Sequence, residues 1–175
     1  MIVTKKIGNI HSLQSTGKYV DWLHLEWYET AKRIMHQRTE SGRELVIKFL
    51  GESQQLAQGD ILFEDDASII AVDILATNTI IIEPVSMYEM AAVCYEIGNK
   101  HLPLFYEQNH LLIPFELPLY RLLVAQGYQV KQAERKLLQP LKTTVSPHGS
   151  ANNSETIFSK IMRMTTASNK SKGEV

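Results

Sequence analysis

The stretch that decides the fold is Thr79-Ile80-Ile81-Ile82-Glu83-Pro84-Val85-Ser86-Met87-Tyr88-Glu89-Met90. Its first five residues are rich in β-branched side chains and predict a strand, which leads through Pro84 into a helical pattern. Ser86 and Glu89 have the S-x-x-E spacing of a capping box, which marks the first turn of a helix. The apolar residues of this predicted helix have helical spacing, and its stripe is Met87, Met90, Ala91, Cys94 and Ile97.

Downstream, the sequence predicts two short extended segments, at residues 102–106 and 110–113. A second helix follows, in which Pro118 is tolerated in the first turn and Gly127 acts as the C-terminal stop. The apolar set of this helix is Leu119, Leu122, Leu123 and Ala125. A last strand at residues 128–131, or a little beyond, completes the order β-α-β-β-α-β, which is that of the split βαβ, ferredoxin-like arrangement.

The preceding part of the chain consists of short β-rich segments separated by polar turns. The predicted strands are residues 2–7, 20–27, 31–37, 44–49, 61–63 and 69–75. We therefore expect an α+β protein with a small β-rich N-terminal domain at residues 1–76 and a ferredoxin-like βαββαβ domain at residues 77–141. After about Pro140 the composition becomes rich in Ser, Asn and Lys, so residues 142–175 are expected to form a flexible tail.

Composition excludes several classes of protein. Of 175 residues, 44% are hydrophobic and 21% are charged, which is ordinary for a globular protein. Lys plus Arg number 18 against 19 Asp plus Glu, so no basic field predicts a nucleic-acid partner. Cys94 is the single cysteine and forms no intrachain disulfide, and no apolar run approaches the ~20 residues that span a bilayer. We expect a cytoplasmic protein with no membrane partner.

Motifs of the common enzyme classes are missing from the sequence. It contains no G-x-x-x-x-G-K, G-x-S-x-G, H-E-x-x-H, C-x-x-C or G-x-G-x-x-G. A hydrolase would need a nucleophile, a base and an orienting group, and no such constellation is visible. The acidic run Glu64-Asp65-Asp66 lies in a predicted turn and is interpreted as solvated. We therefore expect that the protein is not an enzyme.

No two histidines have the i, i+2 or i, i+4 spacing of a local chelating pair. The six histidines are His11, His24, His36, His101, His110 and His148. His24 lies in an alternating run and is predicted to be an ordinary sheet histidine, whereas His11 and His36 flank turns and are predicted to be solvated.

His101 is different because it extends the helical spacing of Cys94 and Ile97. Two interpretations stay open from the residues alone. The imidazole interacts with the dipole at the helix C-terminus, or it is a ligand at the end of an apolar face in a symmetric dimer. In a two-fold dimer one histidine per chain becomes two ligands at the axis.

Residues 94–104, Cys-Tyr-Glu-Ile-Gly-Asn-Lys-His-Leu-Pro-Leu, resemble the C-Y-x-[LI]-G-N-[RK]-H-x-P-L signature of the UreE family of urease accessory proteins. Residues 58–62 resemble the family's G-D-[VI]-L element, and the spacing to residues 122–127 also fits. The resemblance extends from the first strand to about Leu141. It implies the two-domain layout and a metallochaperone that binds Ni(II) at a homodimer interface and delivers it for assembly of the urease nickel active site.

The resemblance also implies site residues and partners. The histidine of G-N-[RK]-H falls on His101, implied to bind nickel jointly with its counterpart in the second chain. His148 matches the C-terminal histidine of relatives, but this sequence lacks their polyhistidine tail and the histidine-rich stretch at residues 114–117. His110 is expected to be an exposed strand residue.

Zn(II) is the alternative ion for the same site. The implied partners are a urease accessory GTPase and, through it, the urease apoenzyme complex, with a tetramer as the alternative to the dimer. A metal-independent protein-binding module is the alternative function.

Overall fold

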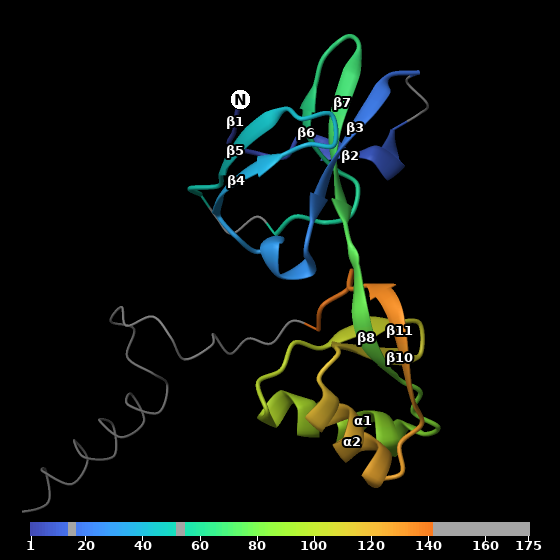
Figure 1. The fold of residues 1–175 in the computed structure, drawn as a ribbon. Helices are drawn as coiled ribbons and strands as arrows, with labels where there is room; N and C mark the ends of the chain where they lie inside the picture. The colour runs from blue at the N-terminus through green and yellow to red at the C-terminus, as the bar shows by residue number, and fades with distance from the viewer. Residues whose placement is uncertain (14–16, 52–54, 142–175) are drawn as a thin grey trace, which may run out of the picture. The chain divides into compact units, whose positions relative to one another are not determined.

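The computed structural model describes residues 1–13, 17–51 and 55–141. Within these residues the chain forms three sheets and two α-helices, which confirms the predicted α+β class (Figure 1). The predicted tail and His148 lie outside the described residues. No helix in the described part of the chain is long and apolar enough to cross a membrane.

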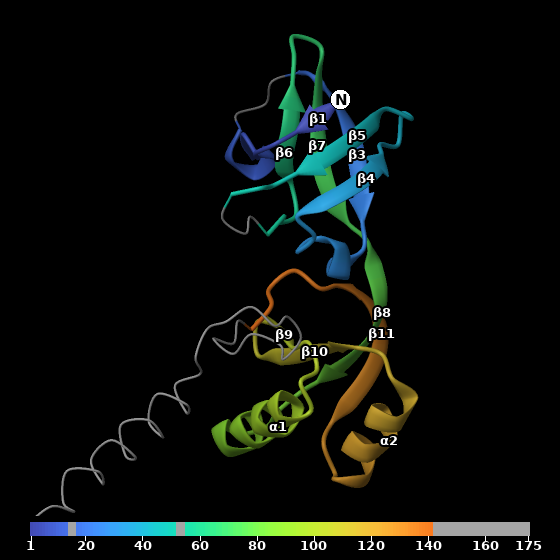
Figure 2. The same cartoon turned by 90° about the vertical axis from the view of Figure 1, so that its left-hand side faces the viewer.

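The N-terminal part contains two sheets that face each other. One has the order β1-β5-β4, from strands Ile2–Val3, Glu44–Lys48 and Ile34–Arg38. The other has the order β2-β6-β7-β3, from strands Gly8–Asn9, Asp60–Glu64, Ser68–Ile74 and Tyr19–Leu25. Figure 2 shows β4 and β5 crossing in front of β3 and β7. Side chains of both sheets share one core, which includes Leu23, Leu25, Leu45, Ile47, Ile70 and Val72.

Several predicted strands of the N-terminal part differ in their bounds, most of all those at residues 2–7 and 31–37. Residues 2–7 form only β1, and β2 begins at Gly8, while β4 begins at Ile34 rather than residue 31. Between β3 and β4 the chain makes a 3-10 turn, Trp27–Glu29, in which the hydroxyl of Thr30 donates to the Trp27 carbonyl at 2.8 Å. Local side-chain to backbone bonds of this kind compete with strand pairing, and propensity alone does not reveal them.

Asp21 of β3 is a fully buried carboxylate that anchors the turn after β4. It accepts hydrogen bonds from the Thr39 hydroxyl at 2.8 Å, the Ser41 amide at 2.9 Å and the Ser41 hydroxyl at 2.5 Å. Burial by itself raises the pKa of Asp21, but these hydrogen bonds and the nearby Arg43 guanidinium outweigh it, so the pKa is lowered. The ionised carboxylate is therefore part of the folded structure.

The C-terminal part has the predicted βαββαβ order. Its elements are β8 (Ala76–Ile82), α1 (Met87–Asn99), β9 (Phe105–Glu107), β10 (His110–Pro114), α2 (Leu117–Ala125) and β11 (Val130–Lys136). The sheet order is β11-β8-β10-β9 with antiparallel neighbours, and both helices cover one face of it (Figures 1 and 2). This order confirms the ferredoxin-like arrangement. Pro118 lies in the first turn of α2, and Gly127 has φ +85°, as a C-terminal stop requires.

Ser86 is the N-cap of α1 as predicted, but the capping box is only half formed, because Glu89 bonds the amide of Val85 and not that of Ser86. The core-facing row of α1 also differs from the predicted one. The Ser86 side chain accepts from the Glu89 amide at 3.1 Å, and the Glu89 carboxylate accepts from the Val85 amide at 2.5 Å. The core side of α1 consists of Met90, Val93, Cys94 and Ile97. The prediction was wrong for Met87 and Ala91, which are exposed, and it omitted Val93. Adjacent rows on a helix both fit the same spacing, so spacing alone does not determine which row is buried.

The connection between the N-terminal and C-terminal parts of the chain is very short. Leu75 alone separates β7 from β8, and its amide donates to the Leu25 carbonyl at 2.9 Å. Trp27 packs edge-on against Phe105, with ring centroids 5.6 Å apart and planes at 83°. The buried residues of this cluster are Phe105, Leu112 and Leu137.

Candidate functional site

His101 lies just beyond the C-terminus of α1, in a left-handed backbone conformation. The helix ends at Asn99, Lys100 is its C-cap, and His101 has φ +54°. The predicted continuation of the stripe of Cys94 and Ile97 is therefore wrong. Ile97 is fully buried and faces the core, whereas His101 is exposed. The helix stops before the turn that would have placed His101 on that row.

The backbone around His101 forms a Schellman motif. The His101 amide donates to the Gly98 carbonyl at 3.0 Å, and the Leu102 amide donates to the Ile97 carbonyl at 3.4 Å. These are the two bonds that close a helix through a left-handed residue, and an apolar contact between the residues at their ends usually accompanies them. Leu102 supplies that contact, because it packs against the cluster that contains Ile97. His101 occupies the position in this motif that glycine usually takes.

A histidine in this conformation has a backbone cost that glycine would avoid. The left-handed region costs an L-residue roughly 1 to 2 kcal/mol, although histidine is found there more often than most residues. Strained residues that persist on a protein surface are candidates for a function of the side chain. The geometry thus favours a role for the His101 imidazole beyond packing.

An exposed apolar stripe of α1 leads toward the same helix end. We define the α1 stripe as Tyr88, Ala91 and Tyr95, which have the spacing i, i+3 and i+7. Tyr88 is 85% exposed and Tyr95 is 75% exposed, and Met87 beside them is 88% exposed. Large exposed apolar side chains that gather in one place are typical of a protein interaction surface.

Cys94 behaves as the sequence predicts. It is partly buried, packs against the core of the C-terminal part, and burial raises the pKa of its thiol. A thiol of this kind is a poor metal ligand at neutral pH because the thiolate is the ligating form. In residues 1–13, 17–51 and 55–141 no group of three or more His, Cys, Asp and Glu residues is arranged to hold a metal ion.

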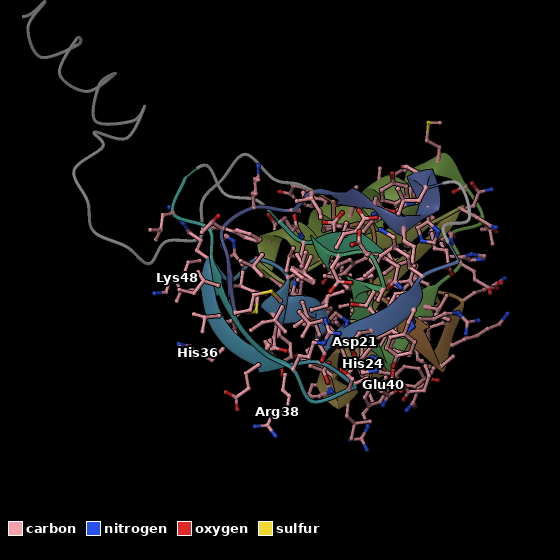
Figure 3. The ribbon with its side chains drawn as sticks, turned by 90° about the horizontal axis from the view of Figure 1, so that it is seen from above. Asp21, His24, His36, Arg38, Glu40 and Lys48 are labelled. Atoms are coloured by element: carbon pink, nitrogen blue, oxygen red, sulfur yellow. The ribbon has the colours of Figure 1, made fainter. Side chains whose placement is uncertain are left out.

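Among the described residues, His24 and His110 lie beside carboxylates, apart from His101 in the sequence. His24 of β3 is exposed and lies between Asp73, with Nδ1 to Oδ2 at 3.2 Å, and Glu40, with Nε2 to Oε2 at 3.9 Å. Figure 3 shows His24 beside Glu40, with His36 pointing away from them. His110 is on β10 and half-exposed, with Nε2 at 3.6 Å from a carboxylate oxygen of Glu83. These environments fit the predictions of sheet and solvated histidines.

The acidic run Glu64-Asp65-Asp66 begins at the last residue of β6 and continues into the turn before β7. The Asp65 side chain accepts from the amides of Ala67 and Ser68 at 2.9 and 2.7 Å, and Glu64 pairs with Lys18 at 2.8 Å. These contacts account for the carboxylates of Glu64 and Asp65. Of the described residues, His101 is the one that we retain as a candidate site residue. Helical spacing did not predict that His101 has a left-handed backbone conformation. Pro103 was the available signal, since the residue before a proline is restricted to extended conformations and the helix must end earlier.

Two family profiles match the chain. The one described as UreE urease accessory protein, N-terminal domain, matches residues 3–75, and the one described as UreE urease accessory protein, C-terminal domain, matches residues 77–156. The chain is 41% identical over 164 residues to the urease accessory protein UreE of Flavobacterium johnsoniae, covering 94% of this chain and 99% of that protein. It is 39% identical over 156 residues to the protein of the same name from Helicobacter pylori strain G27, covering 87% and 92%. For that of Haemophilus influenzae strain PittEE, identity is 37% over 145 residues, covering 81% and 78%.

Proposed function

The chain belongs to the UreE family of urease accessory proteins, and from this premise we propose that it is a metallochaperone that binds Ni(II) at a homodimer interface and delivers it to the urease active site during assembly. Family membership supports an accessory role in urease maturation. As an accessory protein it acts on the urease system without being the urease itself, and we propose no catalytic reaction for it.

The observation that carries the nickel proposal is the exposed His101 imidazole, held in a left-handed conformation at the end of α1. Imidazole is a good ligand for divalent nickel, copper and zinc. A single imidazole leaves most of the coordination sphere of the ion unfilled. A second copy of the chain related by a two-fold axis supplies the same residue again, so that two His101 side chains share one ion.

The α1 stripe supports a dimer in this orientation. Tyr88, Ala91 and Tyr95 are exposed in one row that runs toward His101. A two-fold interface brings the same patch of both subunits together, so an apolar patch is complementary to itself. Packing of two α1 stripes about an axis that passes near the C-terminal end of α1 covers Tyr95 and brings the two His101 residues together. A tetramer formed from two such dimers is the alternative assembly.

We propose His148 as an additional ligand. It lies outside the described residues but within the region that matches the C-terminal domain of the family. A site with few histidines at an interface gains and loses ligands one at a time, as transfer of nickel requires. Zn(II) is the alternative ion, because imidazole ligands do not discriminate strongly between these metals. The proposed recipients are a urease accessory GTPase and, through it, the urease apoenzyme complex.

Equilibrium dialysis of the full chain against nickel sulfate tests the proposal. The natural sequence is expected to bind one ion per two chains through the shared site, and His101→Ala is expected to lose this binding. His36→Ala is the matched control, because it removes another exposed histidine, on β4, that we place outside the site. Truncation after Val145 should weaken binding less than His101→Ala does.

Unchanged nickel binding by His101→Ala would overturn the assignment of the ligand. Absence of nickel binding in the natural sequence would instead support the alternative, a metal-independent protein-binding module.

A further inference from the structure

We propose that Leu102 is a positioning residue for the nickel site: its side chain holds the turn closed and so fixes the direction in which His101 presents its imidazole. This inference rests on the function proposed above. It assigns the neighbouring residue a role in metal binding that does not require Leu102 to touch the metal.

Leu102 anchors the turn by backbone and side chain together. Its amide donates to the Ile97 carbonyl at 3.4 Å, a long bond that is weak by itself. Its side chain packs against the C-terminal core cluster, which includes Ile97 and Leu104, 0% and 9% exposed. The apolar contact therefore contributes more than the hydrogen bond to keeping the turn closed.

The chain after Leu102 strengthens the same constraint. Pro103 restricts Leu102 to extended conformations and prevents the helix from continuing. The Leu141 amide donates to the carbonyl of Leu104 at 2.8 Å, so the chain is tied down again two residues after Leu102. His101 is thus held between the end of α1 and an anchored segment.

This constraint matters because His101 would otherwise leave the left-handed region. For a residue with a Cβ atom, right-handed and extended conformations are lower in energy. If Leu102 is released from the core, the backbone at His101 relaxes and the imidazole is redirected. In a two-fold site both ligands are displaced at once, so one substitution misplaces two ligands.

The test compares three leucine variants of the full chain, using nickel sulfate as the probe in calorimetric titrations. Leu102→Ala removes the anchor, and Leu102→Met keeps its volume. Leu122→Ala is the matched control, because Leu122 is also a half-buried leucine of the C-terminal part but lies on α2. Each variant is also measured for free energy of unfolding without metal and for its Cα and Cβ chemical shifts at His101, which report the backbone conformation.

We expect Leu102→Ala to weaken nickel binding by about 10-fold to 100-fold, the range found when residues that orient metal ligands are removed. Leu102→Met should restore most of the affinity, and Leu122→Ala should change it little. The His101 chemical shifts should move in Leu102→Ala alone.

Equal loss of affinity in Leu102→Ala and Leu122→Ala would overturn the proposal, since it would reflect general destabilisation. Unchanged affinity in Leu102→Ala, while His101→Ala abolishes binding, would also overturn it but would leave the proposed function standing. Failure of the natural sequence to bind nickel would contradict the proposed function itself.

Discussion

Replacing His101 by glycine should make the metal-free protein more stable while abolishing nickel binding. His101 has φ +54° in the Schellman motif, where glycine is the usual residue. Glycine has no Cβ atom, so the substitution removes a backbone cost of roughly 1 to 2 kcal/mol from the folded state. The greater freedom of glycine in the unfolded chain offsets about 0.5 to 1 kcal/mol of this gain. With mid-range values of both contributions, the expected net stabilisation is about 0.5 to 1 kcal/mol.

Urea unfolding followed by far-UV circular dichroism in the presence of EDTA measures this difference. All samples must have the same protein concentration, because association of subunits shifts apparent stability. In a thermal scan the same gain corresponds to a rise in Tm of roughly 1 to 4 °C for a chain of this size. Calorimetric titration with nickel completes the comparison.

His101→Ala is the control, because alanine removes the imidazole but keeps the Cβ atom. It should lose nickel binding as the glycine variant does, yet gain no stability. The reasoning would be refuted if the glycine variant were no more stable than the alanine variant, since His101 would then not be under backbone strain.

Three further predictions concern residues away from the proposed nickel site. Asp21→Asn should destabilise the fold by about 1 to 3 kcal/mol at pH 7 in urea titrations, because buried donors lose a charged acceptor. Since the pKa of Asp21 is lowered in the folded state, its contribution is present above the unfolded pKa of about 3.9 and is lost as pH falls through the folded pKa, so the variant should lose less stability on acidification than the natural sequence. Gly59→Ala should destabilise more than Gly42→Ala in the same assay: both glycines have positive φ, but a Cβ at Gly59 would lie 2.9 Å from a side-chain carbon of Ile10, whereas at Gly42 nothing lies within 4 Å. Cys94 should react slowly with a thiol reagent at pH 7.5, because burial raises the pKa of its thiol, and rapid labelling would contradict its packed position.

The βαββαβ order could be predicted because its signals are local. The N-cap at Ser86, the proline in the first turn of α2 and Gly127 each act within one turn of helix, and all three have the predicted role. The row of α1 that faces the core could not be predicted. A row that includes Met87 and a row that includes Val93 both have helical spacing. The position of the sheet decides which of the two rows is buried, and that position is a tertiary property.

The sequence identified the candidate site residue, His101, but did not predict its backbone conformation or the direction of its side chain. His101 was identified from its spacing and from the resemblance of residues 94–104 to a family signature. Its backbone conformation depends on the contact between Leu102 and the core, which is a tertiary interaction. Helical spacing assumes that the helix continues, so it placed His101 on a row that ends with Ile97.

The single residue between β7 and β8 has a consequence for how this sequence can change over generations. Side chains of a strand alternate between its two faces, so adding or deleting one residue at Leu75 would reverse the facing of every residue in β8 relative to β7. We therefore expect selection to remove insertions and deletions between β7 and β8. They should accumulate instead where chain length is free to vary, as in surface loops.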